Sequence, residues 1–166
     1  MRILFIITCL ANIAFALGSL PWMPSPMAIH FGLDGTPNGF AHPITYAMSM
    51  SIFVGIVAVL FPSISLVTAR TPSSWINIPN RNYWLNEENR PKTLRRLCSS
   101  IELCGIAMML VLLFMQWEFL RASQKVPPKL NNGFFWFGIC LLLVFITIEH
   151  VRLYLSFRLP TDKDSC

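Results

Sequence analysis

The chain has 166 residues, of which 54% are hydrophobic and only 13% are charged, and its mean hydropathy is +0.56. Soluble domains usually contain about 25% charged residues, so this composition excludes an ordinary soluble domain and predicts an integral membrane protein with short loops. The formal net charge of +5 does not indicate nucleic-acid binding, because tracking phosphates requires a basic face rather than an apolar chain with scattered charges.

Four apolar runs follow one another along the chain, and a helix needs about 20 such residues to cross the bilayer core. They predict membrane spans at about residues 3–20, 44–69, 98–118 and 131–155. The expected fold is an all-α transmembrane protein, a four-helix membrane bundle that forms a single integral membrane domain over residues 1–166. The first run also resembles a signal peptide, whose cleavage would leave three spans, but its apolar residues continue beyond the Ala14-Phe15-Ala16 cleavage motif and favour a retained span.

Basic residues are distributed unevenly between the loops. Loop 1, residues 21–43, contains no Lys or Arg, whereas loop 2, residues 70–97, contains six. One side of the membrane holds ten of the thirteen basic residues: Arg2, the six in loop 2, Arg152, Arg158 and Lys163. The positive-inside rule therefore predicts that both termini and loop 2 are cytoplasmic and that loops 1 and 3 are outside.

Loop 1 has the most specific sequence in the chain. Asp34-Gly35 and Asn38-Gly39 are typical turn dipeptides, because Gly, Asn and Asp tolerate positive φ. Residues 27–33 have the pattern of a short extended segment before the first turn. We therefore expect an ordered, turn-rich extracytoplasmic loop 1 with positive φ at Gly35 and Gly39.

Two motifs carry a resemblance to a known family. His30-Phe31-x-x-x-Gly35-x-Pro37-Asn38-Gly39 resembles the N-terminal motif of a bacterial membrane domain of unknown function, which also occurs in SdpI-type immunity and signalling proteins for a secreted peptide toxin. The segment Ile78-Pro79-Asn80-Arg81-Asn82-Tyr83-Trp84-Leu85 is similar to the second signature of a short, four-span branch of that family. The resemblance implies a four-span fold in the bacterial cytoplasmic (inner) membrane. It implies no particular activity, because the short branch has no established one.

The candidate ligand- or partner-binding residues of loop 1 are His30, Phe31, Asp34, Gly35, Pro37, Asn38 and Gly39. His30, Asp34 and His42 also offer metal ligands, but their spacing matches no metal motif. The cysteines likewise form no ligand pattern and no close pair, and they are Cys9, Cys98, Cys104, Cys140 and Cys166. We expect no metal site, no cofactor and no disulfide framework.

Ionisable residues inside membrane spans are costly and therefore mark candidate sites. Glu102 lies near the inner end of the third predicted span, and Glu149, His150 and Arg152 lie near the inner end of the fourth. At about 1.5 Å per residue the four side chains are expected at a similar depth, which predicts an intramembrane polar cluster. Such a cluster would relay a proton, bind a polar ligand or join the two spans, and a structural ion pair near the head groups is the simpler alternative.

Two other polar segments have plainer interpretations. Glu118 and Arg121 are expected to form an exposed i,i+3 pair at the outer end of the third span. Asn86, followed by Glu87 and Glu88, has the pattern of a helix N-cap with acidic residues in the first turn. The aromatic and basic residues of loop 2 would serve as a docking site for a partner or an anionic lipid, or as an interfacial anchor.

Enzyme motifs are lacking in the sequence: we find no P-loop, no H-E-x-x-H and no G-x-S-x-G pattern, and we expect no catalytic residue. Two functions remain. The first is a binding, sensing or immunity-like module that engages a peptide or lipid through loop 1. The second is a structural or accessory subunit of a larger membrane complex, which would cover small-residue faces such as Gly55 and Ala58 or Gly105 and Ala107. The oligomeric state is not determined by the sequence.

Overall fold

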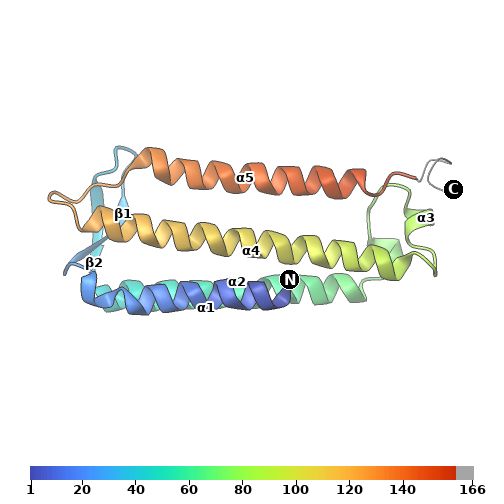
Figure 1. The fold of residues 1–166 in the computed structure, drawn as a ribbon, viewed down its shortest axis with the longest axis horizontal. Helices are drawn as coiled ribbons and strands as arrows, with labels where there is room; N and C mark the ends of the chain where they lie inside the picture. Colours follow the sequence, from blue (N-terminus) through green and yellow to red (C-terminus); the bar gives the residue numbers. More distant parts are fainter. Residues whose placement is uncertain (160–166) are drawn as a thin grey trace.

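The structure is a computed structural model that describes residues 1–159. Its elements in chain order are α1 (Arg2–Gly18), β1 (Met27–Phe31), β2 (Pro37–Ala41), α2 (Pro43–Arg70), α3 (Arg81–Trp84), α4 (Arg90–Ser123) and α5 (Asn132–Leu155), with short 3₁₀ turns at Leu20–Trp22 and Ser73–Trp75. The four long helices lie side by side, with the two strands at one end, the hairpin end, and α3 at the other, the α3 end (Figure 1). Lys163 and Cys166 lie outside the described residues.

Three of the helices are long and apolar enough to cross a membrane. These are α2, α4 and α5, with 28, 34 and 24 residues, and α1 is a shorter apolar helix of 17 residues. At 1.5 Å per residue α1 is about 25 Å long, slightly less than the hydrocarbon core of a bilayer. The prediction of a mostly helical protein with membrane-type apolar helices is therefore confirmed.

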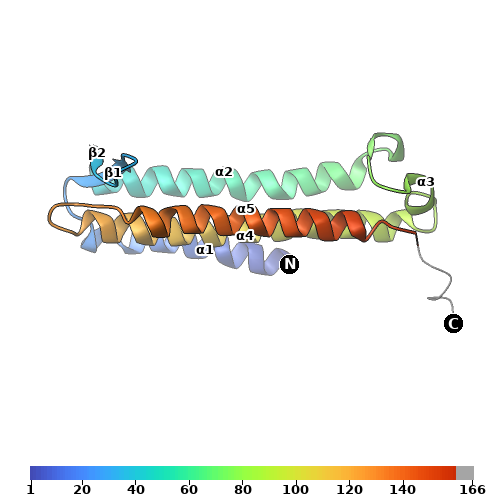
Figure 2. The same cartoon turned by 90° about the horizontal axis from the view of Figure 1, so that it is seen from above.

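The α4 helix lies at the centre of the structure. It packs against α1, α2 and α5, and α1 also packs against α2. In Figure 1, α5 lies on one side of α4 and α1 with α2 on the other, and the turned view separates α2 from α1 (Figure 2). The main core between α1, α2 and α4 consists of Phe5, Cys9, Val54, Val57, Ile106 and Met109.

Small residues allow the helices to approach α4 closely. A Cβ on Gly105 of α4 would lie 2.9 Å from ring atoms of both Phe5 and Phe61, and a Cβ on Gly138 of α5 would lie 2.9 Å from the ring of Phe114. The small-residue face at Gly105 is therefore covered by the chain's own aromatic rings rather than left for a partner. Gly55 of α2, in contrast, has open space beside it.

Asn12 provides a polar link between α1 and α4. Its side chain is fully buried, and its Nδ2 donates to the carbonyls of Thr8 at 2.8 Å and Met109 at 2.9 Å. Gln116 Nε2 donates to Asn12 Oδ1 at 2.8 Å. Because apolar surroundings offer no other partner for these amides, the bonds define how α1 sits along α4.

The start of α4 differs from the expected one. Asn86 makes the hydrogen bond typical of an N-cap, because its Oδ1 accepts the Asn89 amide three residues on at 2.7 Å, but it does so in the turn that precedes the helix. The helix begins at Arg90 instead, with Pro91 in its first turn. A proline is well tolerated there, since the first amides of a helix have no intrahelical acceptor.

Replacing Asn12 with alanine removes the amide that joins α1 to α4 and leaves the Gln116 donor without its buried acceptor. We expect Asn12→Ala to lower the free energy of unfolding in mild detergent by about 1 kcal/mol or more, measured as a shift in the unfolding midpoint. Thr147→Ala is the control, because the Thr147 hydroxyl donates only to the Leu143 carbonyl within α5 at 2.8 Å. Equal shifts for both variants would contradict an interhelical role for Asn12.

Candidate functional site

The strands β1 and β2 form an antiparallel hairpin between α1 and α2. The register places His30 opposite Gly39 and Phe31 opposite Pro37, with an irregularity on each side of His30. Four residues of the first sequence motif therefore form two cross-strand pairs. The His30 Nδ1 donates a hydrogen bond to Asn38 Oδ1, which adds a side-chain link between the strands.

The connection between the strands is a turn built on Asp34 and Gly35. Gly35 has φ +79°, and its amide donates to the Gly32 carbonyl at 2.9 Å. The Asp34 carboxylate accepts the Thr36 hydroxyl at 2.8 Å and the Thr36 amide at 3.1 Å. These two contacts, the hydroxyl above all, hold the pKa of Asp34 below its ordinary value, so the carboxylate stays charged and keeps the turn closed.

The expectation of positive φ at Gly39 is wrong. Asn38 and Gly39 lie inside β2, and within residues 1–159 the only positive φ values are those of Gly35 and Asn80. Strand pairing determines the conformation here, because the residue opposite Gly39 is His30. A Cβ on Gly39 would lie 3.0 Å from the His30 Cβ, so the glycine is needed for close approach of the strands.

The hairpin turn is attached to the loop between α4 and α5. The Leu130 amide donates to the Gly35 carbonyl at 2.9 Å, and Asn132 Nδ2 donates to the Leu33 carbonyl. A Cβ on Gly35 would lie 2.5 Å from the Leu130 carbonyl oxygen. Gly35 therefore meets two requirements at once, a positive φ and direct contact between two backbones.

A cavity of about 170 Å³ lies between β1 and the ends of α4 and α5 at the hairpin end. Aromatic rings form much of its wall: Phe31 stacks on Phe119 with ring centroids 5.7 Å apart, and Phe119 stacks on Phe135 at 6.1 Å. Trp136 meets Phe135 edge-on at 5.5 Å. Because three separate segments supply these rings, the cavity exists only when the hairpin is docked.

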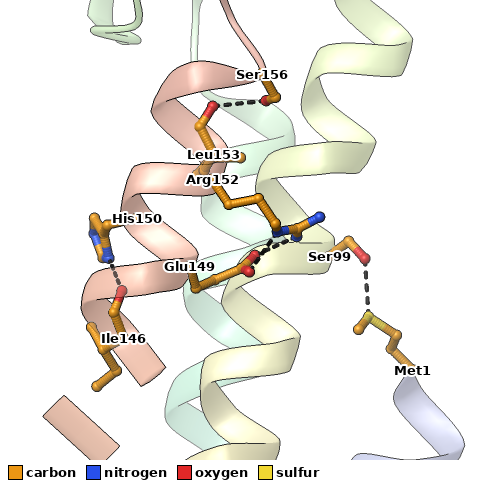
Figure 3. A network of polar contacts seen from close by, with 8 residues as sticks. All are labelled: Met1, Ser99, Ile146, Glu149, His150, Arg152, Leu153 and Ser156. Atoms are coloured by element: carbon orange, nitrogen blue, oxygen red, sulfur yellow. Dashed lines mark hydrogen bonds and ion pairs between the residues drawn. The ribbon is translucent and has the colours of Figure 1, made fainter. Parts of the chain in front are cut away.

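The four residues of the predicted intramembrane cluster are divided between separate contacts. Arg152 Nε and Nη2 donate to the two carboxylate oxygens of Glu149 at 2.7 and 2.6 Å (Figure 3). Figure 3 shows His150 on the opposite side of α5, where its Nδ1 donates to the Ile146 carbonyl at 3.1 Å. Glu102 instead pairs with Arg2 of α1, at 3.2 Å. Two ion pairs therefore replace the single predicted cluster.

The Glu118–Arg121 pair forms as an i,i+3 contact, with Arg121 Nη1 donating to Glu118 Oε1 at 3.4 Å. The prediction that the pair is exposed is wrong for Glu118, which is only 5% exposed. The reason is the central position of α4, which has neighbouring helices on more than one side. A polar position on such a helix becomes buried even where the sequence pattern suggests a surface.

The second motif of the resemblance joins the loop before α4 to the end of α5. Asn80, with φ +51°, donates through Nδ2 to the Phe157 carbonyl at 2.9 Å, and Trp84 Nε1 donates to the same carbonyl at 2.8 Å. The Thr93 hydroxyl donates to the Trp84 carbonyl at 2.7 Å. These residues therefore hold α3 and α5 together at the α3 end.

Metal binding finds no geometric support in residues 1–159, where no group of three or more His, Cys, Asp or Glu side chains is placed to hold an ion. His30 and Asp34 are engaged within the hairpin as described. The His42 Nδ1 accepts the Ile44 amide at 3.3 Å and caps α2. The described cysteines, Cys9, Cys98, Cys104 and Cys140, are free thiols.

No family model, curated protein or solved structure matches the chain. The assignment of function therefore depends on the geometry above and on the resemblance of the two loop motifs.

Several important residues of the hairpin end lie outside the motifs. Leu130 and Asn132 hold the turn, and Phe119, Phe135 and Trp136 line the cavity. In the sequence, only Asn131-Asn132 pointed to this region, because asparagines before an apolar run often mark the start of a helix.

Gly35→Ala should release the hairpin from the α4–α5 loop, because the new methyl group would lie 2.5 Å from the Leu130 oxygen on a backbone with φ +79°. We expect amide hydrogen exchange over residues 27–41 to accelerate about tenfold or more, as expected for strain above about 1 kcal/mol. Gly18→Ala is the matched control, because nothing lies within 4 Å of its added Cβ. Unchanged exchange in Gly35→Ala would contradict the docking role.

Glu149→Gln should destabilise the protein more than Glu118→Gln, although both acids are about equally buried. The reason is bond geometry: Glu149 receives two short bonds from Arg152, and Glu118 receives one of 3.4 Å. We expect a loss of about 1–3 kcal/mol for Glu149→Gln and less for Glu118→Gln, measured by unfolding in detergent. Equally small losses would show that the Glu149 pair contributes little.

Proposed function

We propose that the chain is a four-span protein of the bacterial cytoplasmic membrane, with both termini and loop 2 inside and the hairpin outside. The 17-residue α1 falls at the lower limit of helices that cross a bilayer, and the other long helices exceed it. Loop 2 at the α3 end carries six basic residues, whereas the α1–α2 connection with the hairpin carries none. The positive-inside rule supports this orientation.

The topology is checked with an enzyme reporter that is active only outside the cytoplasm. Inserted after Leu33 in the hairpin turn, the reporter should be active, and inserted after Trp75 in loop 2 it should be inactive. The physical basis is the retention of Lys- and Arg-rich loops on the inner side. The reverse pattern of activity would reject the orientation.

We further propose that the hairpin end is a binding module, of the sensing or immunity-like kind, that engages a peptide or lipid from the outer side. The observation that carries the proposal is the aromatic cavity between β1, α4 and α5. At about 170 Å³ it is smaller than a typical drug-binding pocket. It suits one apolar side chain of a peptide or the end of one lipid chain.

The cavity is positioned for such a role. His30 and Asn132 place polar groups in a wall otherwise rich in Phe and Trp rings, and a few polar groups in an apolar pocket are what orient a ligand. The hairpin is attached to α4 and α5 before any ligand arrives, so little ordering is required on binding.

The alternative function, a structural or accessory subunit, is supported by the face of α2. Gly55 has nothing within 4 Å of an added Cβ, and the neighbouring Ile52, Ile56 and Val59 are more than half exposed. A helix of a partner protein would pack closely at such a position. Lipid chains would cover the same face if no partner exists.

Photo-crosslinking in the native membrane separates the two functions. A benzoylphenylalanine at Leu33, in the cavity wall and 88% exposed, should give a discrete peptide or lipid adduct. Its yield should fall several-fold in His30→Ala, because the cross-strand bond that shapes β1 is lost. A benzoylphenylalanine at Gly55 should then give only bulk lipid. A discrete protein adduct at position 55, with none at position 33, would reject the binding module and favour the accessory subunit.

A further inference from the structure

A second cavity, which has a polar wall, lies between the inner ends of α4 and α5, away from the hairpin. Its volume is about 470 Å³, and its wall consists of Arg96, Ser99, Arg152, Leu153 and Ser156. Two arginines from different helices therefore meet at one opening. Figure 3 shows Arg152 extending from α5 towards α4, with Ser99 and Ser156 nearby.

Arg96 brings a positive charge that no described carboxylate neutralises. Its Nη1 donates to the Ser156 carbonyl at 3.3 Å, and its guanidinium lies 5.2 Å from the centre of the Trp84 ring. The ion pairs formed within residues 1–159 involve Arg2, Arg121 and Arg152 but not Arg96. The ring and the carbonyl hold this guanidinium in place without cancelling its charge.

Arg152 is fixed in a different way. Glu149, buried at 4% exposure, binds its Nε and Nη2, which leaves Nη1 without an acceptor among the hydrogen bonds of the described residues. The ion pair thus neutralises Glu149 and holds the planar guanidinium in one orientation. A guanidinium held this way presents its remaining N–H donors at little cost in side-chain entropy.

We propose that this cavity binds the phosphate group of an anionic phospholipid from the inner leaflet. Guanidinium groups form strong charge-assisted bonds with phosphate oxygens. The hydroxyls of Ser99 and Ser156 also line the cavity, although in this structure they donate to Met1 Sδ at 2.9 Å and to the Leu153 carbonyl at 2.7 Å. Basic pockets between membrane helices on the cytoplasmic side are known to hold lipid head groups. The proposal uses the topology above but does not depend on the hairpin ligand.

The position of the cavity favours a lipid over a soluble phosphate. Ser99 and Arg152 lie at the inner ends of the apolar stretches of α4 and α5, the depth at which head groups are found. Leu153 forms the apolar part of the wall, and the adjoining surface of α5 exposes Ile148, Val151 and Leu155. An acyl chain attached to the bound phosphate can therefore lie along α5.

The test uses the full-length protein in mild detergent, with lipid binding followed by native mass spectrometry. The probes are phosphatidylglycerol, phosphatidylcholine and inorganic phosphate. Wild-type protein should retain phosphatidylglycerol in preference to phosphatidylcholine, and millimolar phosphate should not displace it. Arg96→Gln should weaken phosphatidylglycerol binding about tenfold, as expected for loss of one charge-assisted contact.

Two further variants make the result specific. Arg95→Gln makes the same charge change one residue away, outside the cavity wall, and should alter binding less than twofold. Ser99→Leu keeps both arginines but fills the cavity, and it should weaken binding about as much as Arg96→Gln. Equal losses for Arg95→Gln and Arg96→Gln, or undiminished binding in Ser99→Leu, would overturn the site. Saturation by inorganic phosphate with displacement of the lipid would overturn the lipid assignment.

Discussion

Packing onto α4 is the interaction on which the rest of the structure depends. In a bilayer the lipid chains are as apolar as leucine, so burial of apolar surface gives little drive for helices to associate. Close packing and buried polar bonds must supply the attraction. On α4, Gly105 admits the rings of Phe5 and Phe61, and Gln116 with the Met109 carbonyl binds Asn12 of α1.

The two ends of the helices are joined by different chemistry. At the hairpin end, backbone contacts between Gly35 and Leu130 connect the α1–α2 loop with the α4–α5 loop. At the α3 end, the side chains of Asn80 and Trp84 share the carbonyl of Phe157. Among the long helices, α5 packs mainly against α4. The two sets of hydrogen bonds tie the two ends of α5 to loops from other parts of the chain, and so they restrain α5. Both sequence motifs thus contribute to the same requirement, attachment of the last helix.

The apolar runs predicted the helices well because helix formation in an apolar chain depends mainly on local composition. The direction in which each side chain points around its helix axis was harder to predict. Glu149 and His150 are adjacent in sequence, but about 100° of helix rotation separates neighbouring side chains, and only Glu149 faces α4 closely enough to be buried. Glu102 met Arg2 because α1 packs beside α4, a contact between segments a hundred residues apart. The aromatic cavity forms only where three segments, β1, the end of α4 and the start of α5, come together, and no local pattern contains that arrangement.

The same distinction separates residues that shape the hairpin cavity from residues that line it. His30, Asp34, Gly35, Asn38 and Gly39 are already engaged with the strands, the turn or the α4–α5 loop. Apolar contact with a ligand is therefore left to the aromatic wall, where Phe31 is the ring contributed by the motif and where His30 and Asn132 add polar groups. Substitutions in the first group should weaken the binding of every ligand to a similar extent, because they change the shape of the cavity. Substitutions in the wall should change the affinity for some ligands more than for others, since ring area and edge geometry determine which apolar group fits.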